Sequence, residues 1–485
     1  MTGIKSQAGA PPAGKAGEPK EKSQLHHGVK PIEGLNRGKM EVPDEAPKEG
    51  GFGRLFNKDP QQPTPQSLID LGKKGGPMDE ADGTPAGDNL TIPLGFVFFG
   101  QFVDHDITLD MTSALDQVSD PKNVINVRTA TLELDSVYAG GPLQDSSDPD
   151  QKMYDPNDPA KLRVGTLSNP DDLPRIAAGA ETGRALIGDP RNDENLIINQ
   201  LHVVFLKFHN KVVDHVRNGG ITTGVFEEAR RLVIWHYQWI VLHDFLPRII
   251  GQAMVDDILQ NGRKHYKIKP NHKPYIPVEF SVAAYRYGHS QLRSRMRLNG
   301  GMADVALFSP QMAGFQPTAI NQVVDWSNFF DRTVGVPGQP SRKIDGKLAG
   351  IVFDLPFIPP DAPPEHRSLA IRNLLRGTTF QLPSGQKVAQ RMQATQLTPA
   401  QLGLQGTGLE SDAPLWFYIL KEADVQQGGD RLGEVGGRIV GEVLIGLLQE
   451  DPDGYLSANP GFVPTLPGAS PGNFSMVDLL NFAAV

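Results

Sequence analysis

The first group in the chain that could transfer protons is a histidine between two aspartates. Gln101, Asp104, His105 and Asp106 lie in the segment GQFVDHD. On a helix, Gln101 and His105 would share one face, because residues four apart lie about one turn from each other. Histidine titrates near neutral pH, so a polar neighbour makes it suited to proton transfer. A core histidine with a satisfied hydrogen bond would give the same pattern, and this segment alone does not separate the two.

A second segment, GDPRNDENL, places a cation and an anion at the start of a long helical pattern. Glu194 is ordinary in a first helical turn, because the amino end of a helix favours negative charge. Arg191 is unfavourable at that end and needs an anion, a ligand or solvent beside it. Arg191 is therefore the less easily explained of the two side chains.

The third segment is EFSVAAYRYGHSQL, in which His289 follows Gly288. A glycine leaves room next to the imidazole, which would suit a flat ligand lying against the helix. Taken alone, His289 is more simply explained as a core residue.

Other histidines occur in two pairs on long helical patterns, His202 with His209 and His236 with His243. Members of each pair are seven residues apart, which is two helical turns. Neither pair can therefore hold one ion from adjacent turns, as an HExxH pair does. We interpret all four as packing or helix-surface histidines.

The elements that must position these groups are mainly helices. Apolar residues recur at the i, i+3, i+4, i+7 spacing of an amphipathic helix over residues 194–216 and 226–250. Further helices are predicted from about residue 94 to 109, over 279–295, 368–375, 415–423, 438–449 and 476–483, and in a short turn that Thr398 would cap. Residues 61–90 and 110–190 are predicted as loops, and loops of the latter length are usually functional or held in place.

These patterns predict a mainly α-helical fold with long loops and little β structure. We expect a single large domain over residues 61–485, because no repeat and no convincing internal boundary appears. Residues 1–60 are rich in Gly, Pro, Lys and Glu, which predicts a disordered or surface-wrapping arm.

Composition excludes several classes of function. The chain has 485 residues, 39% of them hydrophobic, a net charge of -9 and no cysteine. The absence of cysteine excludes disulfides, thiolate nucleophiles and cysteine-held metal clusters, and the net negative charge argues against bulk nucleic-acid binding. Without a visible signal peptide or membrane span we expect a cytoplasmic protein, with leaderless secretion as the alternative.

The segments that contain His105, Arg191 and His289 are more informative together than each is alone. GQFVDHD, DPRNDEN and AAYRYGH occur in this order, together with HVVFLKFHN, LDSVY and RNLLRG. From about residue 90 onward the chain resembles the animal-type haem peroxidases of the peroxidase–cyclooxygenase superfamily, and LELDSVYAGGP and EVGGRIVGEVLIGLL suggest a bacterial branch. The resemblance implies a large helical haem-peroxidase domain that binds haem b.

The resemblance also implies roles for residues on both sides of the haem. His105 would be the distal histidine that moves a proton between the peroxide oxygens, Arg191 would stabilise the developing charge, and Gln101 would hold the distal water or a halide. On the proximal side the implied residues are His289 as the iron ligand, Asn373 as acceptor of the other imidazole N–H, and Arg286 and Arg376 near the haem propionates.

The resemblance further implies that haem can be attached covalently. Asp104 and Glu194 match the two carboxylates that form ester links to haem methyl groups in the family. Asn195 stands where myeloperoxidase-like members have a methionine that forms a sulfonium link, so that bond cannot form here. The oxidation of chloride is therefore in doubt.

A calcium site is implied as well, between Asp106 of the distal segment and a short loop. The loop residues that match are Thr129, Thr131, Glu133 and Asp135. Alternate residues of an extended loop point the same way, so their oxygens can converge on one hard cation. Glu133 stands where an aspartate is usual, and its longer side chain would shift or weaken the site. A solvated polar loop is the alternative.

The reaction implied is the reduction of hydrogen peroxide through an oxoferryl intermediate, in the manner of an enzyme that responds to oxidative stress. Electrons would come from small phenolic or aromatic donors or from iodide, bromide or thiocyanate. One alternative is a fatty-acid dioxygenase of the same superfamily, which carries a catalytic tyrosine three residues before the proximal histidine. Arg286 occupies that position here. The other alternative is a non-catalytic adhesion protein with this fold, but the chain keeps His105 and Arg191 and has no RGD tripeptide.

Overall fold

The computed structural model describes residues 51–57, 59–80, 87–110, 119–121, 124–139, 141, 149–166 and 168–485. Residues 1–50 of the predicted N-terminal arm lie outside the described residues. The stretch that follows them is attached to the domain, because strand β1 (Phe52–Gly53) pairs in parallel with β4 (Ile276–Pro277).

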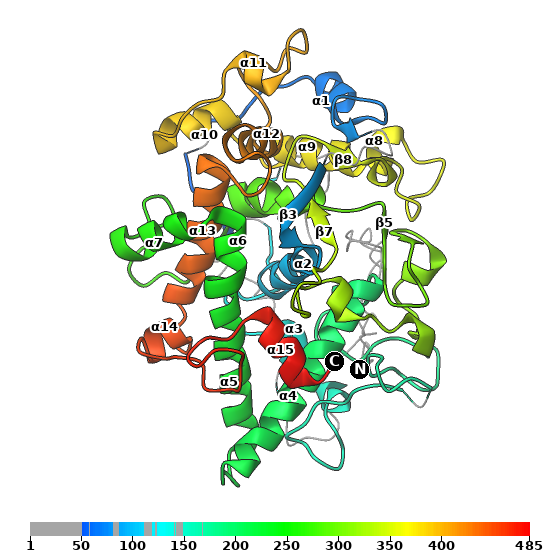
Figure 1. Cartoon of the computed structure of the whole chain (residues 1–485). Coiled ribbons are helices and arrows are strands. Elements are labelled where there is room, and N and C mark those ends of the chain that lie inside the picture. Colours follow the sequence, from blue (N-terminus) through cyan, green and yellow to red (C-terminus); the bar gives the residue numbers. More distant parts are fainter. Residues whose placement is uncertain are drawn as a thin grey trace, which may run out of the picture.

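Helices dominate the described chain, which confirms the mainly α-helical prediction (Figure 1). The longest, α4 (Leu196–Asn218), packs against α5 (Val225–Ile240), α2 (Gly95–Ile107) and α15 (Met476–Ala483). The other helices are α1 (Pro65–Gly72), α3 (Asp135–Tyr138), α6 (Leu246–Ile250), α7 (Gln252–Asn261), α8 (Pro364–Arg367), α9 (Leu369–Thr379), α10 (Gly385–Met392), α11 (Pro399–Leu402), α12 (Leu415–Gln427), α13 (Glu434–Gln449) and α14 (Tyr455–Ala458). No helix in the described part of the chain is long and apolar enough to cross a membrane.

The strands are short and join segments that are far apart in the sequence. β2 (Asp79–Glu80) pairs in parallel with β8 (Leu348–Ala349), whereas β3 (Asp88–Pro93) with β7 (Pro340–Arg342) and β5 (Arg295–Met296) with β6 (Val305–Ala306) are antiparallel pairs. The pair formed by β3 ends where α2 begins, so it fixes the start of that helix.

Helix α2 is fixed in the core by its aromatic side chains. Phe102 stacks on Phe205 of α4 with ring centres 4.4 Å apart, and Phe99 meets Phe245 edge-on at 5.5 Å. Close-packed aromatic contacts of this kind fix the rotation of a helix about its axis. The rotation matters because Gln101 and His105 both reach the same cavity from this helix.

The helix predicted over residues 279–295 is shorter and irregular. Glu279–Ala283 form a π-helical turn, and Ala284–His289 continue as a 3₁₀ turn in which the helix ends. The buried Glu279 carboxylate accepts hydrogen bonds from the backbone N–H groups of Leu55 (3.0 Å) and Phe56 (3.4 Å). This long-range contact, which no local pattern reveals, holds the start of the turn. Short π-helical turns are often found at functional sites.

Two further expectations were only partly correct. The helix predicted over residues 226–250 contains a π-helical turn at Val241–Phe245, just before Pro247, which has no N–H to donate. The segment 61–90, predicted as loop, contains helix α1, which Thr64 caps and Pro65 begins.

The turn that carries Glu194 is held by a close backbone contact. Asn195 bridges to Ala313, and the N–H of Phe315 donates to the carbonyl oxygen of Asp193 at 2.7 Å. Gly314 lies between these contacts, where an added Cβ would stand 2.0 Å from that carbonyl oxygen. Only glycine allows the two backbone segments to approach this closely.

We expect Gly314→Ala to destabilise the fold by about 1–3 kcal/mol, because the added methyl group forces backbone apart as an overpacked core does. Thermal unfolding followed by circular dichroism would show a lower midpoint. The control is Gly300→Ala, at a position where a Cβ would meet no atom within 4 Å. Equal thermal unfolding midpoints for the two variants would contradict the close contact between Gly314 and the carbonyl oxygen of Asp193.

Candidate active site

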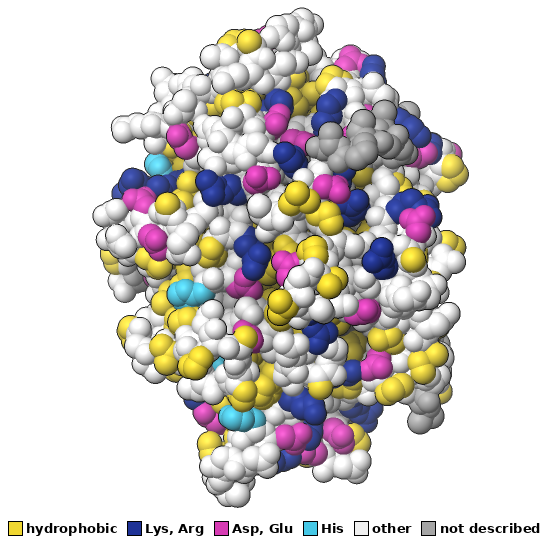
Figure 2. All heavy atoms as spheres, viewed as in Figure 1, with side chains coloured by type: hydrophobic (Ala, Val, Ile, Leu, Met, Phe, Trp, Pro, Cys, Tyr) yellow, Lys and Arg dark blue, Asp and Glu magenta, His cyan; other side chains and the backbone are white. Residues whose placement is uncertain are grey.

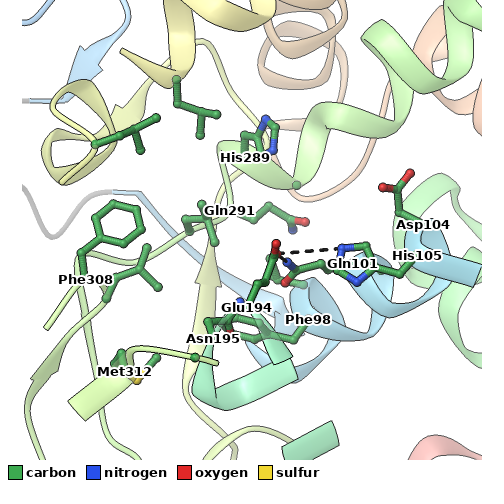
Figure 3. A pocket seen from close by; sticks show the side chains of 18 of the residues that line it. Phe98, Gln101, Asp104, His105, Glu194, Asn195, His289, Gln291, Phe308 and Met312 are labelled. Atoms are coloured by element: carbon green, nitrogen blue, oxygen red, sulfur yellow. Dashed lines mark hydrogen bonds and ion pairs between the residues drawn. The ribbon is translucent and has the colours of Figure 1, made fainter. Parts of the chain in front are cut away.

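A cavity of about 520 Å³ opens inside the domain, between α2 and the irregular turn that ends at His289 (Figure 3). His105 and His289 both line it, one from each element. The volume lies within the range of small-molecule and cofactor sites, roughly 300–1,000 Å³. The predicted site residues that line it are Gln101, Asp104, His105, Glu194, Asn195, Arg286 and His289.

His105 is held in one orientation. His105 is 2% exposed, and its Nδ1 lies 2.8 Å from Oδ1 of Asn192. An amide oxygen only accepts hydrogen bonds, so Nδ1 carries the proton and Nε2 has a free lone pair. Nε2 faces Glu194, whose carboxylate oxygen is 3.9 Å away (dashed in Figure 3).

The surroundings keep His105 uncharged. Burial, and then the charge of Arg191, lower the pKa of the imidazole, and the carboxylates of Glu194, Asp189 and Asp104 oppose them less strongly. A neutral imidazole with a free Nε2 is able to accept a proton at neutral pH. The structure therefore gives His105 the protonation state that its predicted role needs.

Glu194 and Asp104 flank His105 on different sides, as Figure 3 shows. The amide of Gln101 donates a hydrogen bond to the Glu194 carboxylate. Asp104 accepts from the hydroxyl of Thr108 at 3.0 Å. Asn195 caps α4, because its side chain accepts hydrogen bonds from the N–H groups of the first turn of that helix. As an asparagine it cannot form a sulfonium link.

Arg191 lies beside His105 but is not among the described residues that line the cavity. Its Nη2 donates to the carbonyl oxygens of His105 (3.0 Å) and Thr108 (2.6 Å) and to Asp189 (2.8 Å). The guanidinium thus compensates the carboxyl end of α2. Direct contact between Arg191 and a peroxide stays a prediction, whereas its influence on His105 follows from this geometry.

His289 contacts Asn373, as predicted, but through the other end of the amide. Nδ2 of Asn373 lies 2.8 Å from Nδ1 of His289, and Oδ1 accepts from Arg286 at 2.7 Å. The family resemblance implies instead that this oxygen accepts from the imidazole. The charged guanidinium is the stronger donor, and it occupies the oxygen here. Iron binding at Nε2 requires a proton on Nδ1, and so requires the amide oxygen to face His289.

His289 is neutral and closely packed. Burial, and then the charge of Arg286, lower its pKa to about 3. Trp416 of α12 packs edge-on to the imidazole at 6.4 Å between ring centres, and its indole N–H donates to the carbonyl oxygen of Arg286 at 3.1 Å. Beside this wall, a Cβ added at Gly288 would meet no atom within 4 Å. The room predicted next to the imidazole is present.

A group of partly buried cations lies near His289. Burial, followed by the nearby charges of Arg376 and Arg372, lowers the pKa of Arg286 to about 10. Arg376 bonds to Asp110 at 2.6 Å, yet burial still lowers its pKa. Cations whose pKa is lowered by burial and by neighbouring cations favour an anionic ligand. The sequence analysis missed Arg372, although it lies one helical turn before Arg376 on α9 and so shares its face.

These observations fit a haem. The cavity presents a neutral imidazole on each of two walls and open space beside Gly288. Arg286 lines the cavity and would face the propionates, whereas Arg372 and Arg376 lie near Arg286 outside the lining. His289, Asn373 and Arg286 would hold the group, and His105 would face it from the other side.

The predicted calcium ligands come together only in part. Asp106 is fully buried and accepts from the N–H of Leu134 (3.1 Å) and the hydroxyl of Ser136 (3.4 Å). Thr129 donates to Glu133, Thr131 is half-buried, and Asp135 lies 3.2 Å from Arg128. Among the described residues, no three acidic or histidine side chains converge as metal ligands do. The loop thus lies against Asp106 without a formed site.

The sequence analysis also missed two residues behind His105. Asn192 bonds to His105 on one side and, at 3.0 Å, to His202 of α4 on the other. His202 had been interpreted as a packing residue. Ten positions separate Asn192 from His202, and nothing in that spacing indicates a contact.

Comparisons with known proteins identify a family and a fold for this chain. The sequence model of the family described as animal haem peroxidase matches residues 113–400. Chorion peroxidase of Aedes aegypti is 24% identical over 305 residues, 60% of this chain and 37% of that protein. Chorion peroxidase of Drosophila melanogaster is 28% identical over 226 residues, 43% of this chain and 27% of that protein. The chain therefore matches less than half the length of these relatives.

Solved structures share the fold. Peroxidase A from Dictyostelium discoideum has a TM-score of 0.63 at 16% identity, over 93% of this chain and 99% of that chain. Fatty acid alpha-dioxygenase of Oryza sativa has a TM-score of 0.59 at 15% identity, over 89% and 81% of the two chains. Fold and cavity together define a mainly helical haem protein of the peroxidase fold. Because the family model matches more than half of the sequence, the chain belongs to the animal haem peroxidase family.

We expect Asn373→Leu to weaken haem retention by about 10–100-fold, the usual effect of removing the partner of a metal-bound histidine. Haem transfer to an excess of apomyoglobin, followed by the Soret absorbance, would measure it. Asn473→Leu makes the same chemical change at an exposed position and should retain haem normally. Identical transfer rates for both variants would show that Asn373 does not support His289.

Proposed function

We propose that this protein is a peroxidase that reduces hydrogen peroxide and oxidises small aromatic donors. His105 would transfer the proton during the reduction. The observation that carries the proposal is the state of His105, which is buried and neutral, with its proton on Nδ1 and its free Nε2 beside the cavity. A packing histidine would not need a lone pair at a cavity that also contains His289.

The residues would act in the following order. Nε2 of His105 accepts a proton from one peroxide oxygen, and it then gives that proton to the other oxygen, which leaves as water. Bound haem would supply the two electrons that break the O–O bond. Glu194, 3.9 Å from Nε2, would stabilise the charged imidazole while it holds the proton, and the nearby Arg191 would favour its release.

The side of the cavity near Phe308 favours aromatic donors. Phe308, Met312, Phe315 and Phe357 line it, and Phe308 packs edge-on to Phe357 at 5.9 Å. Phe357 is 43% exposed, so this wall reaches the surface. Phenols and anilines can stack on such rings before they give up an electron. Iodide, bromide and thiocyanate are the further donors that we propose. The oxidation of chloride is in doubt, because Asn195 cannot form the sulfonium link.

Two finer proposals concern what the site binds. Asp104 and Glu194 both reach the cavity, so both can form ester links to haem b.

We also propose calcium at Asp106 and the loop 129–135. Oδ1 of the buried Asp135 faces Arg128 at 3.2 Å, its Oδ2 lacks a hydrogen-bond partner in the described part of the chain, and Asp106 lies close by. A hard cation would satisfy these carboxylates.

The dioxygenase alternative is not favoured. Arg286 occupies the position of the catalytic tyrosine, and its guanidinium is bound to Asn373. Tyr285 lines the cavity but donates its hydroxyl to the carbonyl oxygen of Gly100 at 3.2 Å. Oxygen uptake with a fatty acid would support that alternative.

We expect His105→Ala to slow the reaction of the haem-loaded protein with one equivalent of hydrogen peroxide by about 10²–10⁴-fold, because the proton acceptor is lost. Stopped-flow spectra of the Soret band would measure the rate. His289→Ala should abolish or strongly alter that band, because the iron loses its ligand. His209→Ala, a buried histidine that does not line the cavity, is the control. A protein that takes up no haem, or reacts equally fast without His105, would favour a non-catalytic role.

Removal of calcium should lower the thermal unfolding midpoint, because Asp106 and Asp135 would lose a shared counterion. Differential scanning calorimetry with and without EDTA, followed by added calcium, would measure the change. Asp106→Asn should remove the sensitivity to EDTA. If EDTA leaves the thermal unfolding midpoint of the unaltered protein unchanged, the loop binds no calcium.

A further inference from the structure

A chain of two directional hydrogen bonds links His105 to a second histidine. Nδ1 of His105 lies 2.8 Å from Oδ1 of Asn192, and Nδ2 of Asn192 lies 3.0 Å from Nδ1 of His202. An amide oxygen only accepts and an amide nitrogen only donates. His105 therefore carries its proton on Nδ1, and His202 carries its proton on Nε2. The three side chains are at most 2% exposed, so water does not compete for these bonds.

The amide of Asn192 couples the tautomers of the two rings. If it turned around, its N–H groups would face His105 and its oxygen would face His202. His105 would then have to move its proton to Nε2, and His202 would have to move its proton to Nδ1. In that state His105 would present an N–H to the cavity and could not take a proton from peroxide.

His202 differs from the other buried histidines of these helices. His209, on the same helix, uses both ring nitrogens, toward the Tyr138 hydroxyl (3.0 Å) and the Ala160 carbonyl oxygen (2.8 Å). His236 also bonds through both, to the Leu232 carbonyl oxygen and to the N–H groups of residues 465 and 466. Nε2 of His202 is buried and has no hydrogen-bond partner among the described residues.

An unsatisfied buried nitrogen lowers stability, so it calls for a reason other than packing. A phenylalanine would fill the same space without this cost. Burial lowers the pKa of His202 to about 3, which keeps the ring neutral and Nδ1 able to accept. What the imidazole supplies, and an apolar ring would not, is the acceptor for Asn192.

We propose that Asn192 and His202 are positioning residues that fix the tautomer of His105 and so keep Nε2 free to accept the proton of the peroxide. The effect on the reaction with peroxide rests on the proposed function. The hydrogen-bond chain from His105 to His202 does not depend on that function. Asn192 is held rigidly for this task, because it lies in a buried 3₁₀ turn that Asp189 caps.

The experiment is ¹⁵N NMR of the full chain with labelled histidine rings, recorded without haem and with haem in the diamagnetic ferrous carbonyl form. The nitrogen shifts report which ring nitrogen carries the proton. We expect Nδ1–H for His105 and Nε2–H for His202. The opposite tautomer at His105 would overturn the proposal, and this spectrum needs no variant.

Variants then separate positioning from general stability. His202→Phe should leave His105 as a mixture of tautomers and slow the reaction with peroxide about 10-fold, less than the roughly 10²–10⁴-fold expected when the proton acceptor itself is removed. His202→Gln, whose amide oxygen can accept from Asn192, should restore both. His209→Phe, on the same helix, should not change the His105 spectrum. A His202→Phe protein with unchanged tautomer and rate would overturn the proposal.

The two proposals fail in different ways. If the spectra show the expected tautomers but the protein does not react with peroxide, the proposed function fails and the hydrogen-bond chain stands. If the protein reacts with peroxide through His105 while His202→Phe changes neither spectrum nor rate, the positioning role fails and the peroxidase stands.

Discussion

The packing of α2 on α4 determines where the distal histidine lies. The Phe102–Phe205 stack, at 4.4 Å between ring centres, fixes the rotation of α2 and so directs His105 toward the cavity. The same pair of helices holds both ends of the hydrogen-bond chain through Asn192, since His105 belongs to α2 and His202 to α4. A small rotation of either helix would break a bond of fixed direction, because close-packed interiors do not deform smoothly.

The proximal wall depends on segments brought from much farther away. His289 ends an irregular turn, Asn373 comes from α9 and Trp416 from α12. The turn begins at Glu279, which is tied to residues 55 and 56 near the start of the described chain. Stability of this wall is therefore a property of the whole domain. It cannot be attributed to one helix.

Electrostatics distinguish the two sides of the cavity. Burial keeps both imidazoles neutral, which suits the role proposed for His105 as a proton acceptor. His289 would bind a metal at Nε2 once the Asn373 amide turns its oxygen toward Nδ1. Positive charge gathers instead at Arg286, Arg372 and Arg376. Arg191 supplies charge behind His105, where it bonds to backbone carbonyl oxygens and Asp189. An anionic planar ligand between the histidines would balance the proximal arginines without charging either ring.

The sequence by itself determined the mainly helical class, most of the long helices and the residue types of the site, because apolar periodicity and ordered motifs are local properties. The bounds of α4, α9 and α15 lie close to those predicted. Only the tertiary structure decided which atoms meet. It turned the Asn373 oxygen to Arg286, kept Arg191 outside the cavity lining, and joined His202 to His105. It also ended the predicted helix at His289, and it tied the start of that irregular turn, at Glu279, to residues 55 and 56. Hydrogen-bond direction and burial depend on partners far away in the sequence, and no spacing along the chain encodes them.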